Sequence, residues 1–200
     1  MNTQAVLFDL GGVLVELGGV DYFGQLIGER DEAEIWRRWL TSHWVRSFER
    51  GRCTREEFAR GMVQENTLDI TPEAFLEVFE SWPRGLFSGA EALVHAVDSH
   101  LTVACLSNTN ELHWTKQKDA ERVHALFPRR FLSHQMDLVK PDREIFDSVA
   151  KALGCPADAI FFMDDNLINV QGARSAGWDA ARAVGVEEAR QLLSQRSLLA

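Results

Sequence analysis

The most constraining feature of this sequence is a short apolar run that ends in an aspartate and is followed closely by two glycines. Ala5-Val6-Leu7-Phe8 precedes Asp9, and Gly11 and Gly12 come next but one. A continuous apolar run of this length indicates a strand buried on both faces of a parallel sheet. The glycines favour a sharp turn and a close approach of the backbone to a ligand. Because open α/β sheets bind ligands beyond the carboxyl ends of their strands, Asp9 is a candidate functional residue. A turn cap is the alternative role for this aspartate.

Length, composition and charge exclude several classes of protein. The chain has 200 residues, of which 46% are hydrophobic, and this suits one domain or a core with a modest insertion. It has no apolar run of eighteen residues, and its first residues do not have the pattern of a signal peptide, so we expect no membrane span. The net charge of −9 disfavours nucleic-acid binding but is compatible with a locally positive site for a small anion. Three widely spaced cysteines indicate reduced thiols and a cytoplasmic protein: Cys53, Cys105 and Cys155.

Residues 16–86 carry helical periodicity and lack a convincing buried strand. Apolar residues from Ile35 to Phe48 fall on one helical stripe. Thr54 with Glu57 has the spacing of a capping box, and Thr71-Pro72 is typical of a helix start. We therefore expect an all-helical insertion, a cap, over 16–86, and a core formed by 1–15 and 87–200.

From residue 89 onwards, helical and strand patterns alternate. The expected helices cover 89–98, a stretch reaching about 122, a stretch from 140 that stops at Gly154, and a stretch reaching about 176. The expected strands cover 101–106, 131–133, 159–163 and 179–184, and the end of the chain beyond about 195 is expected to fray. This alternation predicts an α/β fold with a doubly wound, Rossmann-like parallel sheet as its core.

Polar side chains follow the apolar runs at four places along the core. They are Asp9, Ser107 with Asn108, Lys140, and Asp164 with Asp165. Taken singly, each has another explanation. Ser107 and Asn108 could cap a helix, Lys140 could be a solvated surface lysine, and Asp164-Asp165 could complement a helix dipole. Together, clustered carboxylates favour a hard cation such as Mg²⁺, and the hydroxyl, amides and ammonium match the oxygens of a phosphate.

The order and spacing of these segments resemble the haloacid dehalogenase (HAD) superfamily. Its four motifs resemble Phe8-Asp9-Leu10-Gly11-Gly12-Val13, Leu106-Ser107-Asn108-Thr109-Asn110, Val139-Lys140-Pro141-Asp142 and Phe161-Phe162-Met163-Asp164-Asp165-Asn166. The helical segment after the first motif resembles the cap of subfamily I. The second and fourth motifs are most similar in wording to those of bacterial sugar-phosphate phosphatases, the α-D-glucose-1-phosphate phosphatases in particular.

The resemblance implies a Mg²⁺-dependent phosphatase that hydrolyses a small phosphorylated metabolite. It implies that Asp9 attacks phosphorus to form an aspartyl-phosphate. Ser107, Lys140 and the backbone amide of Asn108 would hold the phosphoryl group. It further implies that Asp9, Asp165 and the Gly11 carbonyl bind the metal, which Asp164 binds directly or through water.

One position departs from the pattern of the family's phosphatases. They usually carry a second aspartate, a general acid and base, where this chain has Gly11. Such a group typically contributes about 10²- to 10⁴-fold to the rate. Three explanations stay open: Glu16, His43 or Glu49 replaces it; the substrate has a good leaving group, such as an anomeric sugar oxygen; or the protein turns over weakly and mainly binds.

Two alternative functions follow from the same departure. A 2-haloacid dehalogenase also lacks the second aspartate, but it needs no metal, and the pair Asp164-Asp165 would then be an uncompensated charge beside Asp9. A phosphate-binding or partner-binding protein is the non-enzymatic alternative.

Overall fold

The computed structural model describes residues 3–116 and 118–200, and its core is a five-stranded parallel sheet. The strand order is β5 (Arg129–Leu132), β4 (Thr102–Ser107), β1 (Ala5–Phe8), β6 (Ile160–Asp164) and β7 (Asp179–Arg182). All four neighbouring pairs are parallel. The predicted α/β class and the strand starts near 5, 101 and 159 are therefore confirmed.

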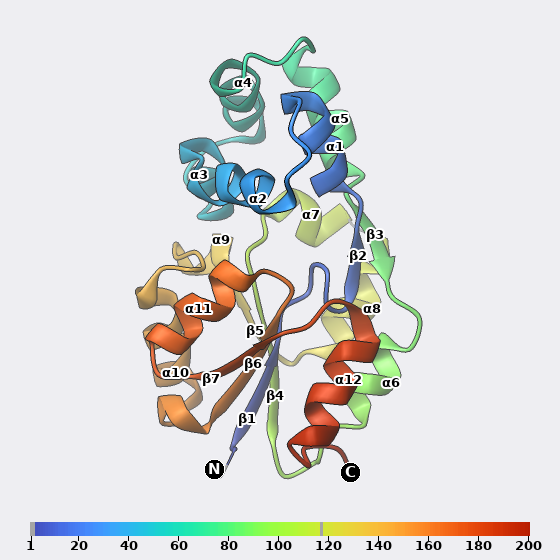
Figure 1. Ribbon diagram of the computed structural model, residues 1–200, viewed down its shortest axis with the longest axis vertical. Helices are drawn as coiled ribbons and strands as arrows, with labels where there is room; N and C mark the ends of the chain where they lie inside the picture. Colours follow the sequence, from blue (N-terminus) through green and yellow to red (C-terminus); the bar gives the residue numbers. More distant parts are fainter. Residues whose placement is uncertain (1–2, 117) are drawn as a thin grey trace.

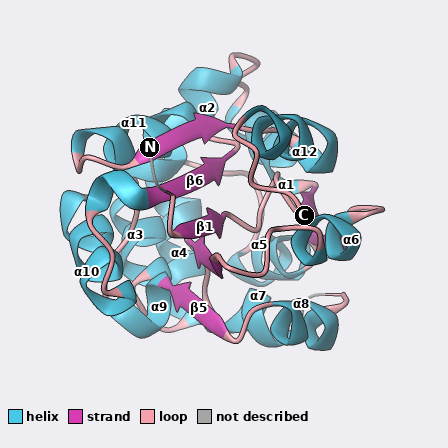
Figure 2. Cartoon of the chain, turned by 90° about the horizontal axis from the view of Figure 1, so that it is seen from below, coloured by secondary structure: helices cyan, strands magenta, loops and turns pink. Residues whose placement is uncertain are grey.

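The central strand β1 is fully buried because helices cover both faces of the sheet (Figures 1 and 2). Val6 and Phe8 point into a core formed with α6 (Ala90–His95), α8 (Ala120–Leu126) and α12 (Gly185–Gln195). Ala5 and Leu7 point to the opposite face, toward α10 (Arg143–Leu153) and α11 (Leu167–Ser175). This alternation is the period-two pattern of a strand between two helical layers.

Five helices lie between two short strands that connect them to the core. They are α1 (Gly19–Ile27), α2 (Glu32–Thr41), α3 (His43–Glu49), α4 (Arg55–Glu65) and α5 (Pro72–Glu80). The strands β2 (Val15–Leu17) and β3 (Pro83–Leu86) pair antiparallel, so the expectation of a segment without strands was wrong at its two ends. Figure 1 shows the five helices above the carboxyl edge of the sheet. The division into a cap of 16–86 and a core of 1–15 and 87–200 stays a prediction, and we use the word cap for this segment.

The helix-capping residues predicted in this segment are confirmed, but the predicted helical stripe from Ile35 to Phe48 forms two helices. Thr54 and Glu57 form a capping box, and Thr71 caps α5 with Pro72 at its first position. The stripe from Ile35 to Phe48 is divided at Ser42, whose hydroxyl accepts a hydrogen bond from the N–H of Val45 and so starts α3. A polar residue that caps the next helix stops the preceding one.

The core differs from the prediction in its connections. The helix expected up to 122 is two helices, α7 (Glu111–Lys116) and α8, and the helix expected over 89–98 ends at His95. A short helix, α9 (Ser133–Met136), follows β5, and a 3₁₀ turn, Ala157–Ala159, precedes β6. The chain end does not fray as expected, because Leu198 is buried and Leu199 pairs with Val97. None of the described helices is long and apolar enough to cross a membrane.

Candidate active site

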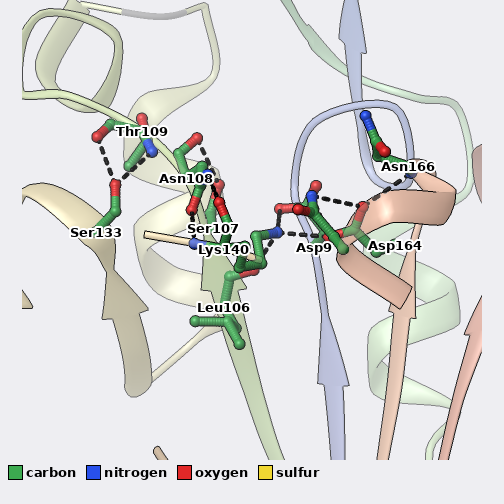
Figure 3. Close-up of polar contacts among 10 residues, drawn as sticks. Asp9, Leu106, Ser107, Asn108, Thr109, Ser133, Lys140, Asp164 and Asn166 are labelled. Atoms are coloured by element: carbon green, nitrogen blue, oxygen red, sulfur yellow. Dashed lines mark hydrogen bonds and ion pairs between the residues drawn. The ribbon is translucent and has the colours of Figure 1, made fainter. Parts of the chain in front are cut away.

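The carboxyl ends of β1, β4 and β6 bring the predicted site residues to one edge of the sheet (Figure 3). Asp9 directly follows β1, and its backbone N–H donates to the carbonyl of Met163 on β6 at 2.8 Å. Ser107 and Asp164 are the last residues of β4 and β6, and both are buried. Parallel alignment of three buried strands thus places two carboxylates and a hydroxyl side by side, as the apolar runs predicted.

The ammonium group of Lys140 lies between the carboxylates. Its nitrogen is 3.0 Å from Oδ1 of Asp9 and 2.6 Å from Oδ2 of Asp164, and it donates to the carbonyl of Leu106 at 3.1 Å. The side chain is completely buried. Burial alone lowers the pKa of this ammonium, but the neighbouring carboxylates outweigh it, so its pKa lies above the usual value. Lys140 is therefore a fixed positive charge whose side chain is shielded from solvent.

The Asn108 side chain holds the backbone of Lys140, a contact that the sequence analysis missed. Its Nδ2 donates to the carbonyl of Lys140 at 3.0 Å, and its Oδ1 accepts from the N–H of Lys140 at 2.9 Å. Ser133 holds the backbone of Thr109 in the same two-point manner, at 2.8 and 2.9 Å. The loops after β4 and β5 are thereby joined to the loop that carries Lys140. The sequence Ser107-Asn108-Thr109 contains these hydrogen-bonding groups, but it does not indicate which distant residues they contact.

Asp164 and Asp165 have different surroundings despite being adjacent. Asp164 accepts hydrogen bonds from the N–H of Asn166 at 2.8 Å and from Nδ2 of Asn169, in addition to its pair with Lys140. Asp165 lacks such donors among the described residues; burial, with Asp164 and Asp9 nearby, raises the pKa of its carboxyl above the usual value. Gly12 has φ +70°, and a Cβ there would lie 2.1 Å from Oδ2 of Asp165. Gly12 therefore provides both the turn and the space for this carboxylate.

The donor set at this edge fits a hard divalent cation. Asp9, Asp164 and Asp165 each offer an oxygen, and the three atoms lie within 4.8 Å of one another. Oδ1 of Asp9 is buried and has no well-aligned hydrogen bond, although the ammonium of Lys140 is 3.0 Å away. Clustered carboxylate oxygens that repel each other are the ligands that Mg²⁺ prefers. Because Asp164 is engaged by several donors, Asp9 and Asp165 are the carboxylates more open to direct ligation, as the resemblance implied.

A cavity opens above this edge, between the core and the cap. Asp9, Ser107, Asn108, Lys140 and Asp165 line it from the core side. Gly11, whose carbonyl the resemblance names as a metal ligand, also lines it; that role stays a prediction. Five further polar residues on this side were not predicted as site residues: Thr109, Asn110, His113, Asn166 and Asn169.

The structure separates the three candidates for the missing acid. Glu49, at the end of α3, lines the cavity and is 9% exposed. Burial chiefly raises the pKa of its carboxyl, opposed by the Lys140 charge and a hydrogen bond from the Trp39 side chain, to about 7. Glu16 and His43 are not among the residues that line the cavity; Glu16 pairs with Arg84 at the surface, and His43 is exposed against Trp44.

His113 connects the core to the cap in its neutral form. Its Nε2–H donates to the carbonyl of Phe79 at 2.7 Å, and its ring stacks on Phe79 with centroids 4.2 Å apart. Burial lowers the pKa of the imidazole to about 4. Ion pairs provide a second connection: Arg46 and Arg50 of the α3 region both approach Oδ2 of Asp142 at 2.6 Å, next to the Lys140 loop.

The doubly wound sheet, with an aspartate, a lysine and an acidic pair at its carboxyl edge, defines the class of the protein: a Rossmann-like α/β protein with a strand-end carboxylate at its site. The chain belongs to the haloacid dehalogenase-like hydrolase family, whose model matches residues 3–177. The resemblance seen in the four motifs is thereby confirmed. The narrower resemblance to glucose-1-phosphate phosphatases stays a prediction.

Similar proteins include one curated relative and several solved structures. Drimenol cyclase drtB of Aspergillus calidoustus is 24% identical over 181 residues, which are 87% of this chain and 33% of that protein. The chain therefore spans about a third of the length of that relative.

The solved structures share the fold. A HAD family enzyme of Bacteroides thetaiotaomicron is 23% identical with a TM-score of 0.70, covering 96% of this chain and 99% of that one. The same enzyme in complex with magnesium and inorganic phosphate is 24% identical with a TM-score of 0.66, covering 90% and 93%. L-2-haloacid dehalogenase of Xanthobacter autotrophicus, with chloropropionic acid covalently bound, is 19% identical with a TM-score of 0.64, covering 99% and 85%.

Proposed function

We propose that this protein is a magnesium-dependent phosphatase that hydrolyses a small phosphorylated metabolite through an aspartyl-phosphate. The observation that carries the proposal is the cluster of three carboxylate oxygens, within 4.8 Å of one another, around the buried ammonium of Lys140. Such a cluster binds a cation, and the cation and Lys140 together attract a phosphate dianion. A bound Mg²⁺, held by Asp9, Asp165 and the Gly11 carbonyl, would supply charge stabilisation for the transferring phosphoryl group.

The residues of the chain then have distinct roles in two displacements. An Asp9 oxygen bonds to phosphorus as the ester P–O bond breaks, and Glu49 gives its proton to the departing oxygen. Lys140, Ser107 and the backbone N–H of Asn108 hold the phosphoryl oxygens. Water then attacks phosphorus while the Glu49 carboxylate takes its proton, the bond to Asp9 breaks, and inorganic phosphate leaves. Asp9 and the protonated Glu49 are restored, so the cycle balances.

The test is phosphate release by the purified protein from a panel of phosphate esters and acyl phosphates, with Mg²⁺ and with a chelator. We expect release with Mg²⁺ and none with the chelator. Absence of release from every compound with Mg²⁺ would favour the phosphate-binding or partner-binding alternative.

Two narrower predictions from the sequence belong to this proposal. The sequence of the second and fourth motifs favours a sugar phosphate such as glucose 1-phosphate. The cysteine pattern favours a cytoplasmic protein, the net charge of −9 disfavours a nucleic-acid partner, and the lack of a long apolar run disfavours a membrane partner. Both stay predictions.

A 2-haloacid dehalogenase is the second candidate, favoured by the shared fold with such an enzyme. It ranks lower because Asp165 is a third carboxylate at the site that a metal-free reaction leaves uncompensated. Chloride release from 2-chloropropionate in the presence of a chelator would reverse this order.

A further inference from the structure

The cavity above Asp9 has a polar floor and an apolar roof. Its floor consists of the core residues that would hold phosphate and metal. In the described part of the cap, Glu49 is the charged residue that reaches the cavity, and the others that line it are apolar, aromatic or glycine. Among them are Phe23, Trp39, Leu40, Phe79 and Trp82.

From this arrangement we infer that the phosphatase acts on phosphate monoesters of apolar alcohols or phenols, with the hydrocarbon group against the cap. The inference rests on the proposed phosphatase function and specifies a substrate class other than the sugar phosphate that the motif sequences favour. An apolar group that leaves water for this roof gains the free energy of burial. The hydroxyl groups of a sugar would lose their hydration there and need partners that the roof does not supply.

The aromatic roof offers few polar atoms, and one of them, Nε1 of Trp82, is buried without a hydrogen-bond partner. The Trp39 side chain lies near Glu49 and lowers the pKa of its carboxyl. Trp39 also packs edge-on against Phe23, with centroids 5.2 Å apart, and lies 4.9 Å from the ring of Trp82. This packing fixes the rings in place, so the roof is a preformed and largely apolar surface.

The first experiment compares two esters that have the same shape and differ in polarity. Cyclohexylmethyl phosphate has a six-membered ring and an exocyclic carbon placed as in glucose 6-phosphate, but it lacks the ring oxygen and the hydroxyl groups. We expect kcat/KM for the cyclohexylmethyl ester to exceed that for glucose 6-phosphate by about 10²-fold or more. Along a series of linear alkyl phosphates, kcat/KM should rise roughly fourfold per methylene until the cavity is filled. Equal or faster hydrolysis of glucose 6-phosphate or glucose 1-phosphate would overturn the inference.

Binding separates this inference from the proposed function. Calorimetry on the Asp9→Asn protein with Mg²⁺ measures affinity for the same two esters when neither is hydrolysed. Tighter binding of the cyclohexylmethyl ester supports the inference even if the wild type releases no phosphate and the proposed function fails. Equal binding, tighter binding of the sugar ester, or binding of neither overturns it.

A matched pair of substitutions locates the selectivity in the roof. Leu40 and Leu68 belong to the same buried cluster and are 7% and 8% exposed, but Leu40 lines the cavity and Leu68 does not. Leu40→Asn should reduce the cyclohexylmethyl-to-glucose ratio of kcat/KM by about tenfold, and Leu68→Asn should leave the ratio unchanged. If the Leu40 variant does not fold, Trp36→Gln replaces it, since Trp36 also lines the cavity and is only half-buried. An equal change in the ratio for the roof variant and the Leu68 variant contradicts the inference.

Discussion

The ammonium nitrogen of Lys140 lies 3.0 Å from Oδ1 of Asp9, in a position completely shielded from solvent. The same ammonium is 2.6 Å from Asp164, so it keeps an ionic partner when Asp9 loses its charge. This arrangement means that the role of Asp9 in the reaction can be tested without disrupting the fold.

Asp9→Asn should reduce phosphate release roughly 10⁴-fold or more, because the amide is a poor nucleophile. Its melting temperature should stay at or above that of the wild type, since one of three repelling carboxylates is removed while Lys140 stays paired. Asp158→Asn, at an exposed position, is the control and should retain full activity. Substantial phosphate release by the Asp9 variant would refute the aspartyl-phosphate mechanism.

Glu49→Gln should lower kcat/KM for alkyl phosphates by about 10²- to 10⁴-fold and that for aryl phosphates much less, because a phenoxide leaves without a proton. In the wild type, the acid form of Glu49 exists below its pKa of about 7, so kcat/KM should fall as the pH rises through 7. The variant should lack this decline. The measurements are pH profiles with both ester classes. Glu16→Gln and His43→Gln are the controls, and a large loss in either would identify a different acid.

His113 makes the stability of the fold depend on pH. The folded-state pKa of about 4 is below the ordinary value of 6.5, so the unfolded chain binds the proton more readily. Stability is full above about pH 6.5 and should fall by about 2 kcal/mol at pH 5 from this residue alone. Denaturant unfolding at pH 7.5 and pH 5 measures the difference, which should shrink in His113→Gln. The exposed His100 provides the control, because His100→Gln should keep the wild-type dependence.

The two arginines on Asp142 should hold the cap against the loop that carries Lys140. Asp142→Asn removes the acceptor charge from both contacts of 2.6 Å. We expect kcat/KM to fall by about 5- to 30-fold, corresponding to about 1–2 kcal/mol for two partly exposed charged pairs. Most of the change should be in KM, and the wild-type KM should rise with ionic strength. Asp147→Asn, which breaks an exposed pair with Arg143, should behave like the wild type. An unchanged KM in the Asp142 variant would exclude this role.

Restoring an aspartate at residue 11 tests the significance of the missing acid. A Cβ at Gly11 would lie 2.6 Å from Cδ1 of Leu17, so the new side chain needs space. Gly11→Asp combined with Leu17→Ala should raise kcat/KM for alkyl phosphates more than for aryl phosphates, because alkoxides need protonation. The same reasoning predicts a larger gain on sugar 6-phosphates than on sugar 1-phosphates. Leu17→Ala alone is the reference, and equal gains in both ester classes would contradict the argument.

The sequence by itself determined the sheet and most of the polar floor of the site. The apolar runs before Asp9, Ser107 and Asp164 are buried parallel strands, and strands in one parallel sheet end at one edge whatever the details of their connections. The helix starts at Thr54 and Thr71 could also be predicted from the sequence, because an N-capping side chain bonds only to the first turn of its own helix.

Only the tertiary structure decided which of Glu16, His43 and Glu49 reaches the cavity. The continuous stripe of α2 and α3 is broken at Ser42, whose hydroxyl donates to Glu65 on α4, twenty-three residues away. The break gives α3 its own direction, with Glu49 at the cavity and His43 in solvent. Tertiary structure also decided the two hydrogen bonds from the Asn108 side chain to the Lys140 backbone and the apolar roof over Asp9. Each of these contacts joins residues far apart in the sequence. The spacing of residues along the chain does not indicate such contacts, because they form only when the chain folds.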